Sequence, residues 1–206
     1  MISLLRKRYR LNTSAVNAHG IKMGMKRIDF ALKWRSMRMY NIGDNIIYGK
    51  TGICAVKDIG YQEMPGNSAR RLYYTLKPIY AAGVIYTPVD NTSVFMRHAV
   101  NHDEAMTLIQ QIPAIENTID DTSDITGKEL PEYYKSLMAS HDCTDLIKLI
   151  ITVYAKKQQA EQDKKKIGQT DQNFMRNAEE LLYGELSVAL GIDKENVPSF
   201  IEQTIA

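Results

Sequence analysis

Short β-type runs alternate with turn residues between positions 39 and 100. Glycine or proline stands near the ends of most of these runs. We expect five strands here, at Asn45–Tyr48, Ile53–Tyr61, Arg71–Leu76, Val84–Thr87 and Val94–His98. Five short strands at this spacing are typical of a small, strongly bent antiparallel barrel. A segment of about 60 residues builds only a marginal core, so we expect the module to pack against a neighbour.

From Asn101 onward the apolar positions follow a helical period. The pattern predicts a short helix over Asp103–Gln111 that Pro113 stops. Pro131 suits the first turn of a second helix that runs to Ala139. These two segments frame an acidic connector that contains Asp120, Asp121 and Asp124.

Three more helices are predicted after Ser140. Ser140 or Asp142 can cap a helix that is apolar nearly all round, which is typical of the buried centre of a bundle. Thr170 is the expected cap of the next helix, and Gly191 its end. A last short helix covers Val197–Ile205.

Composition supports this division of the chain. Residues 39–100 hold 6 of the 12 glycines and 7 of the 12 tyrosines, whereas the next 106 residues hold only 4 glycines. We therefore expect an α+β protein: a β module at 39–100, a helix plus acidic connector at 101–129, and an all-α helical domain at 130–206.

The first 38 residues differ from the rest. They carry 10 basic residues and 1 acidic residue, and they show no sustained hydrophobic period. Two interpretations stay open. The segment is either a disordered basic arm, or the product of a start placed too far upstream, with the natural chain beginning at Met37 or Met39.

The remaining composition excludes several classes of protein. No apolar run reaches 18 residues, so we expect no transmembrane helix and no membrane partner. The two cysteines, Cys54 and Cys143, lack metal-ligand spacing and suit a reducing, cytoplasmic setting.

No group of residues in the sequence has the types and spacing of a known catalytic or metal site. Gly49-Lys50-Thr51 resembles the end of a phosphate loop, but the glycine required at position 44 is Asp44. His98 and His102 have the spacing of two metal ligands on one helix, yet the predicted helix begins after His98. We therefore expect neither enzymatic activity nor a cofactor or metal.

Three segments of the sequence resemble a known family. They are YNIGDNIIY at Tyr40–Tyr48, YYTLK at Tyr73–Lys77 and LYGEL at Leu182–Leu186. In this order the chain resembles CarD/CdnL-type bacterial transcription regulators, whose first module also occurs in the transcription-repair coupling factor. The resemblance covers about residues 39–190.

The resemblance implies a fold and a function. The fold is a Tudor-like five-stranded antiparallel module followed by about five helices. The module is expected to bind the β subunit of bacterial RNA polymerase, and the helical domain to contact promoter DNA at the upstream edge of the melted region. Such a protein stabilises the open complex, acts as a cytoplasmic, nucleoid-associated monomer, and is no enzyme.

The family's polymerase-facing strand falls on Val84, Ile85, Tyr86 and Thr87. An exposed strand edge suits this role, because its unpaired N–H and C=O groups can accept a strand from a partner.

The DNA-contacting half departs from the family. The position of the family's wedge tryptophan is Leu130, and Glu132 stands where a basic residue is expected. Leucine is also a known minor-groove wedge. The expected DNA-binding residues are Leu130, Lys135, Lys148, Lys156 and Arg176. Residues 130–206 nevertheless carry 9 basic and 12 acidic side chains, so a polymerase-binding adaptor with little or no DNA contact is the alternative. A nucleic-acid binder that acts through the basic arm is a third hypothesis.

Overall fold

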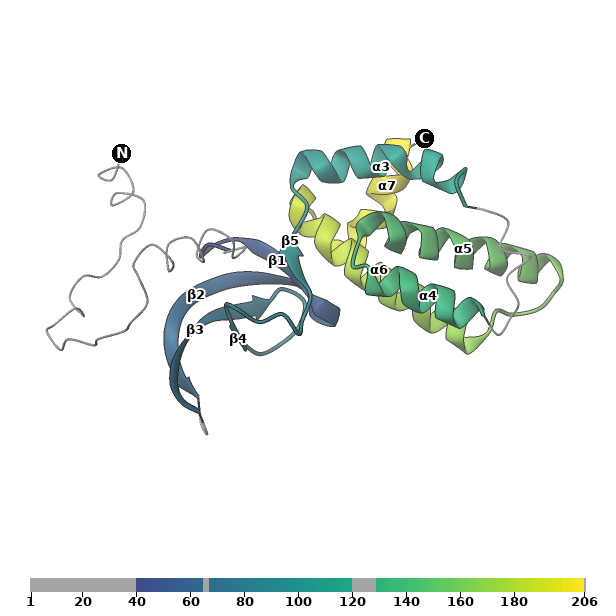
Figure 1. The fold of residues 1–206 in the computed structure, drawn as a ribbon. Helices are drawn as coiled ribbons and strands as arrows, with labels where there is room; N and C mark the ends of the chain where they lie inside the picture. Colours follow the sequence, from purple (N-terminus) through teal and green to yellow (C-terminus); the bar gives the residue numbers. More distant parts are fainter. Residues whose placement is uncertain (1–39, 65–66, 120–128, 206) are drawn as a thin grey trace, which may run out of the picture. The chain divides into compact units, whose positions relative to one another are not determined.

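A computed structural model describes residues 40–64, 67–119 and 129–205 of the protein. The interpretations of residues 1–38 and of the acidic residues Asp120, Asp121 and Asp124 lie outside the described residues. Five strands come first along the described chain (Figure 1): β1 (Asn45–Tyr48), β2 (Gly52–Met64), β3 (Asn67–Pro78), β4 (Ile85–Pro88) and β5 (Met96–His98). The 3₁₀-helix η2 (Gly49–Thr51) stands between β1 and β2, where the phosphate-loop resemblance lay.

The strands form one antiparallel sheet in the order β4-β3-β2-β1-β5. The five predicted strands are confirmed, and so is the α+β class. β2 and β3 are longer than predicted and pair along almost their whole length, with register shifts between Val56 and Asp58 and between Gln62 and Met64. Such irregularities increase local twist, which bends the sheet around its own core.

That core is small. Its buried members are Tyr40, Ile46, Cys54, Val56, Tyr74 and Leu76. Tyr40 begins the described chain and closes one end of the core, because its N–H donates to the Tyr74 hydroxyl at 3.0 Å and the two rings lie 5.7 Å apart. Burial raises the pKa of the Cys54 thiol to about 11, so this cysteine behaves as a small apolar side chain.

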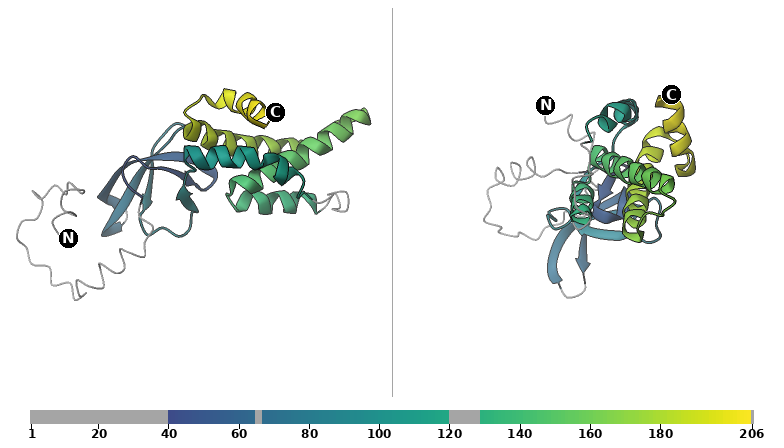
Figure 2. Two further views of the ribbon diagram at one scale, coloured as in Figure 1. Left: turned by 90° about the horizontal axis from the view of Figure 1, so that it is seen from above. Right: turned by 90° about the vertical axis from the view of Figure 1, so that its right-hand side faces the viewer.

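Five α-helices follow in the described part of the chain: α3 (His102–Glu116), α4 (Leu130–Ala139), α5 (Cys143–Gln162), α6 (Gln169–Leu190) and α7 (Val197–Ile205), with the 3₁₀-helix η4 (Lys194–Asn196) before α7. Figure 2 shows the helices gathered beside one another. None of these helices is long and apolar enough to cross a membrane.

Two predicted helix boundaries are wrong. Pro113 does not stop α3, which continues to Glu116. The apolar face carries on through the proline, since Leu108 and Ile115 are both buried in the helical core. Thr170 does not cap α6, because the helix begins at Gln169 and its N-cap is Gly168, two residues before Thr170. The Asp142 cap of α5 is confirmed: its carboxylate accepts from the Thr144 N–H at 2.8 Å.

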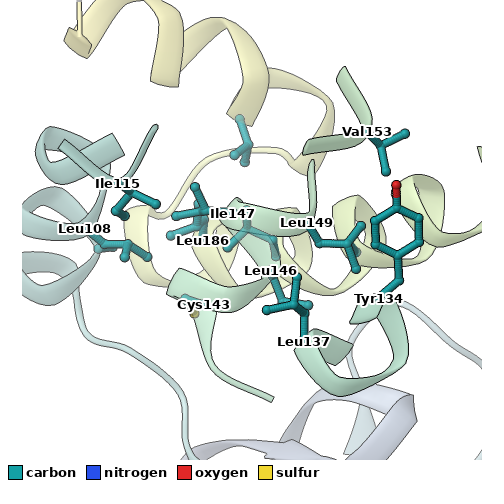
Figure 3. Close-up of a cluster of buried hydrophobic side chains, with 14 of the residues drawn as sticks. Leu108, Ile115, Tyr134, Leu137, Cys143, Leu146, Ile147, Leu149, Val153 and Leu186 are labelled. Atoms are coloured by element: carbon teal, nitrogen blue, oxygen red, sulfur yellow. The ribbon is translucent and has the colours of Figure 1, made fainter. Parts of the chain in front are cut away.

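Buried side chains from all five helices form one core (Figure 3). α5 supplies the largest share, with Leu146, Ile147, Leu149 and Val153 all buried, as its nearly continuous apolar run predicts. α3 belongs to the same core through Ala105, although it lies in the segment expected to hold only a helix and a connector.

Leu130, the predicted DNA wedge, has a buried side chain. Its side chain is only 7% exposed and belongs to the helical core. A side chain packed among Tyr134, Leu137 and their neighbours is not available to enter a DNA groove in this conformation. Packing thus explains the apolar residue at the start of α4, and a role of Leu130 as a DNA wedge stays a prediction.

We predict that Leu130→Ala lowers the free energy of unfolding by about 2–5 kcal/mol, the usual cost of truncating a buried leucine. Leu130→Met, which conserves volume, should cost less than about 1.5 kcal/mol. Urea unfolding followed by circular dichroism measures both. Leu130→Trp should also destabilise the fold, because the larger ring overfills the site; an unchanged or higher stability for Leu130→Trp would contradict the core assignment.

Candidate functional site

One edge of the sheet is open. β4 pairs with β3 only, and no other described strand covers its far side. The Val89 N–H donates to the Leu72 carbonyl at 3.0 Å, toward β3. Backbone groups alternate in direction along an antiparallel strand, so the N–H and C=O of Tyr86 point to the open side. Pro88, two residues later, has no N–H to offer there, which limits the open edge to a short segment.

The side chains of this edge divide into two pairs. Val84 and Tyr86 are 50% and 47% exposed, whereas Thr87 is 1% exposed and Ile85 packs against the module core. Thr87 Oγ1 accepts a hydrogen bond from Asn91 Nδ2 at 2.8 Å. Of the four residues predicted to bind polymerase, Val84 and Tyr86 therefore have exposed side chains, while Ile85 and Thr87 hold the strand in place.

The loop that leads into β4 is tied to α6 through Tyr80. The Tyr80 hydroxyl lies 2.6 Å from Ser187 Oγ, and the ring packs on Gly184, where an added Cβ would stand 3.3 Å from Tyr80 Cδ2. The Lys194 ammonium lies 4.8 Å from the ring centroid, within cation–π range. The segment before the open edge is thus fixed by the helices and not only by the sheet.

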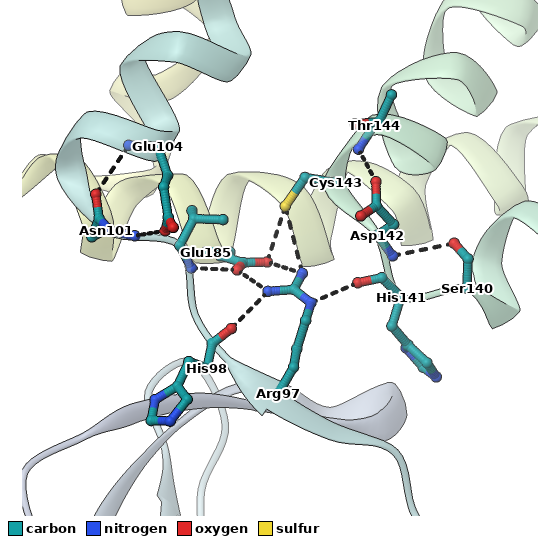
Figure 4. A network of polar contacts seen from close by, with 11 residues as sticks. Arg97, His98, Asn101, Glu104, Ser140, His141, Asp142, Cys143, Thr144 and Glu185 are labelled. Carbon is teal, nitrogen blue, oxygen red and sulfur yellow. Dashed lines mark hydrogen bonds and ion pairs between the residues drawn. The ribbon is translucent and has the colours of Figure 1, made fainter. Parts of the chain in front are cut away.

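The opposite edge of the sheet is joined to the helices by a buried ion pair (Figure 4). Arg97 on β5 forms a two-pronged contact with the Glu185 carboxylate on α6: Nη1 donates to Oε1, and Nη2 donates to Oε2 at 2.7 Å. Glu185 is 1% exposed and also accepts from the Val100 N–H at 2.9 Å. A charge buried to this degree needs such partners to offset the loss of water.

The same guanidinium holds the turn between α4 and α5. Arg97 Nε donates to the His141 carbonyl at 2.9 Å, and Nη2 lies 3.5 Å from Cys143 Sγ. His141 has a φ of 53°, an uncommon conformation for a residue with a side chain. Its ring stacks on Phe95 with 4.7 Å between centroids. Three elements, β5, α6 and the α4–α5 turn, therefore meet at one arginine.

The Glu185 carboxylate changes the pKa of both of its side-chain neighbours at this junction. Burial acts to lower the pKa of Arg97, but the hydrogen bonds and charge of Glu185 outweigh it and raise that pKa above its usual value. Burial, and then the charge of Glu185, raise the pKa of the Cys143 thiol, which donates to Glu185 at 3.3 Å. The raised pKa favours the protonated thiol, which acts here as a hydrogen-bond donor to Glu185.

Sequence reasoning missed Arg97, Glu185 and Tyr80 as key residues. Glu185 did carry a signal, since it is the one charged residue within the apolar stretch Leu182–Leu186. A charged side chain on the apolar face of a helix implies a buried partner. Nothing in the sequence identified that partner as Arg97, because the two lie 88 positions apart.

The predicted DNA-binding lysines are mostly paired with carboxylates. Lys135 lies 2.6 Å from Glu132, Lys148 lies 3.3 Å from Asp145, and Lys156 lies 2.7 Å from Asp171. Arg176 is exposed, and its Nη2 donates to Oδ1 of the Asn173 side chain at 3.0 Å. These residues come from α4, α5 and α6, and the structure shows local neutralisation of three of them instead of a free basic patch.

The fold and the open edge agree with one comparison. Residues 40–100 match the family model described as the CarD-like/TRCF RID domain, and this part of the chain belongs to that family. A RID domain is an RNA polymerase-interaction domain, which identifies RNA polymerase as the partner of the module. No curated protein matches the chain.

We predict that Arg97→Met lowers the free energy of unfolding by about 3–5 kcal/mol, because it leaves the Glu185 carboxylate buried without its cation. The double variant Arg97→Met/Glu185→Leu should be more stable than Arg97→Met alone, since it removes both charges. Urea unfolding of the parent, both single variants and the double variant measures the coupling energy. If the losses of the two single variants add up to the loss of the double variant within about 0.5 kcal/mol, the two side chains do not stabilise each other.

Proposed function

We propose that this member of the CarD-like/TRCF RID family is a bacterial transcription initiation regulator. In this proposal the open β4 edge accepts a strand of the polymerase β subunit, and the helical domain contacts promoter DNA near the upstream edge of the melted region. Binding to both would stabilise the open complex. The observation that carries the proposal is the free edge of β4 within a domain whose family binds polymerase.

The shape and chemistry of the edge suit strand addition. The outward N–H and C=O of Tyr86 supply the main-chain hydrogen bonds, which are sequence-independent. The half-exposed side chains of Val84 and Tyr86 supply apolar area on the outer face. A partner strand that pairs with Tyr86 and packs on these two side chains satisfies both features.

A second candidate function is a polymerase-binding adaptor with little or no DNA contact. The pairing of Lys148 with Asp145 and of Lys156 with the mostly buried Asp171 favours it, since a nearby carboxylate weakens the attraction of a lysine for phosphate. The burial of Leu130 also favours it, because a side chain in the helical core is not exposed to DNA. The two functions differ in whether the chain changes the lifetime of the open complex.

We predict that the double variant Val84→Glu/Tyr86→Glu loses most of its capture of RNA polymerase in a pull-down. A partner strand that packs on this face would take two unpaired carboxylates out of water, which costs free energy. Tyr86→Pro should weaken capture as well, because it removes the one outward N–H. Tyr61→Glu is the matched control: Tyr61 is 59% exposed in the same module but lies on β2, away from the edge.

Circular dichroism checks that each variant folds. A photo-crosslinking amino acid at position 86 should label the β subunit, and label on a different subunit would contradict that part of the proposal. If folded Val84→Glu/Tyr86→Glu captures polymerase as well as the parent does, the β4 edge is not the binding surface.

We predict that the full chain lengthens the lifetime of polymerase open complexes on a linear promoter fragment, and that Val84→Glu/Tyr86→Glu abolishes the effect. Filter binding with a heparin challenge measures this lifetime. Capture of polymerase without any change in lifetime would favour the adaptor.

A further inference from the structure

Tyr80 lies in the loop that joins β3 to β4, residues 79–84, and its side chain contacts α6. The residue is 47% exposed, so it lies outside the buried core of the module. Its ring nevertheless packs on Gly184, and its hydroxyl lies 2.6 Å from Ser187 Oγ. A side chain that is half exposed adds little to the core, so the main consequence of these contacts is the position of the loop.

The donor in the contact between Tyr80 and Ser187 follows from the other hydrogen bond of the serine. Ser187 Oγ donates its one proton to the Gly184 carbonyl at 2.9 Å, which leaves its lone pairs for Tyr80. The Tyr80 hydroxyl is therefore the donor, and the two bonds form a chain from the loop to the backbone of α6. Ser187 is 1% exposed, so little water competes for this acceptor.

The strand that follows this loop has little support of its own. β4 has 4 residues, and among the described strands it pairs with β3 alone. The loop before it contains the exposed residues Ala81, Ala82 and Gly83, and Gly83 has a φ of 100°. Such a segment has many accessible conformations, and holding it in one of them costs conformational entropy. The contacts of Tyr80 restrict the loop before any partner binds.

We propose that Tyr80 is a positioning residue for polymerase binding: its hydrogen bond to Ser187 holds the loop so that β4 is already ordered when a partner strand arrives. This inference rests on the proposed function, since it concerns the affinity of the same edge. A strand that is ordered beforehand loses less conformational entropy on binding, so it binds more tightly. Because the acceptor of the bond lies on α6, the affinity of the sheet edge depends on a helix that does not itself touch the partner strand.

The test measures the affinity of the full chain for immobilised RNA polymerase by biolayer interferometry. Tyr80→Phe removes the hydroxyl and keeps the ring, and Ser187→Ala removes the acceptor. Each should weaken the affinity by about two- to tenfold, the effect of one hydrogen bond. The double variant should bind about as well as the weaker single variant, because all three lack the same bond. Tyr154→Phe is the matched control, since Tyr154 is 50% exposed on α5, and it should bind as the parent does.

A second measurement separates positioning from overall stability. The N–H groups of Ile85 and Thr87 point toward β3, so they are protected from hydrogen exchange only while β4 is docked. In the free chain, Tyr80→Phe should exchange faster than the parent in the peptide that spans β4. Peptides from β1 should exchange at the parent rate, and the midpoint of urea unfolding should stay unchanged.

Three results would overturn the inference: parent-like affinity of both Tyr80→Phe and Ser187→Ala, an equal loss of affinity in Tyr154→Phe, or unchanged exchange of β4 in Tyr80→Phe. Faster exchange throughout the chain together with a lower urea midpoint would show a merely structural role and would also overturn it. The binding data distinguish this inference from the proposed function. A parent chain that does not bind polymerase refutes the proposed function, whereas a parent that binds no more tightly than the two variants refutes only the role of Tyr80.

Discussion

The buried carboxylate of Glu185 constrains the way in which the sheet meets the helices. With 1% of its surface exposed, it needs donors from several directions, and it finds them in the Arg97 guanidinium, the Val100 N–H and the Cys143 thiol. Arginine is suited to this position because its planar fork offers two parallel donors to one carboxylate and still leaves Nε for the His141 carbonyl. A lysine would provide the charge but not this geometry.

The order of the strands gives the two edges of the sheet different roles. β5, at one edge, carries Arg97 and is committed to the helices, whereas β4, at the other edge, is open to a partner. Tyr80 links the approach to β4 with α6 through Ser187. A partner bound at β4 is therefore connected to α6 by two separate routes, and the sheet, whose own core is small, gains support from its larger neighbour.

Local sequence patterns predicted the strands and helices well. Contacts between residues far apart in the sequence could not be predicted from these patterns. Turn residues located all five strands, and Gly191 and Asp142 located helix ends, because each acts on its own neighbourhood. The predicted end of α3 at Pro113 was wrong, because the burial of Ile115 favours a helix that continues past the proline. The burial of Leu130 was not predicted for a related reason: an apolar residue at a helix start gives the same sequence pattern whether it packs inward or faces DNA. Salt bridges such as Lys156–Asp171 join residues on different helices. The sequence alone therefore could not show which lysines are paired with a carboxylate.

The helical core is held to the sheet at one end of α5. This helix begins at Cys143, in contact with Arg97 and Glu185, and its 20 residues extend about 30 Å. The junction thus fixes one end of a long helix relative to β5. In the proposed function, a polymerase held at β4 would raise the effective concentration of promoter DNA around the helices, so a weak contact with DNA would be sufficient there. Under that proposal, specificity of location would come from the polymerase and not from the helices.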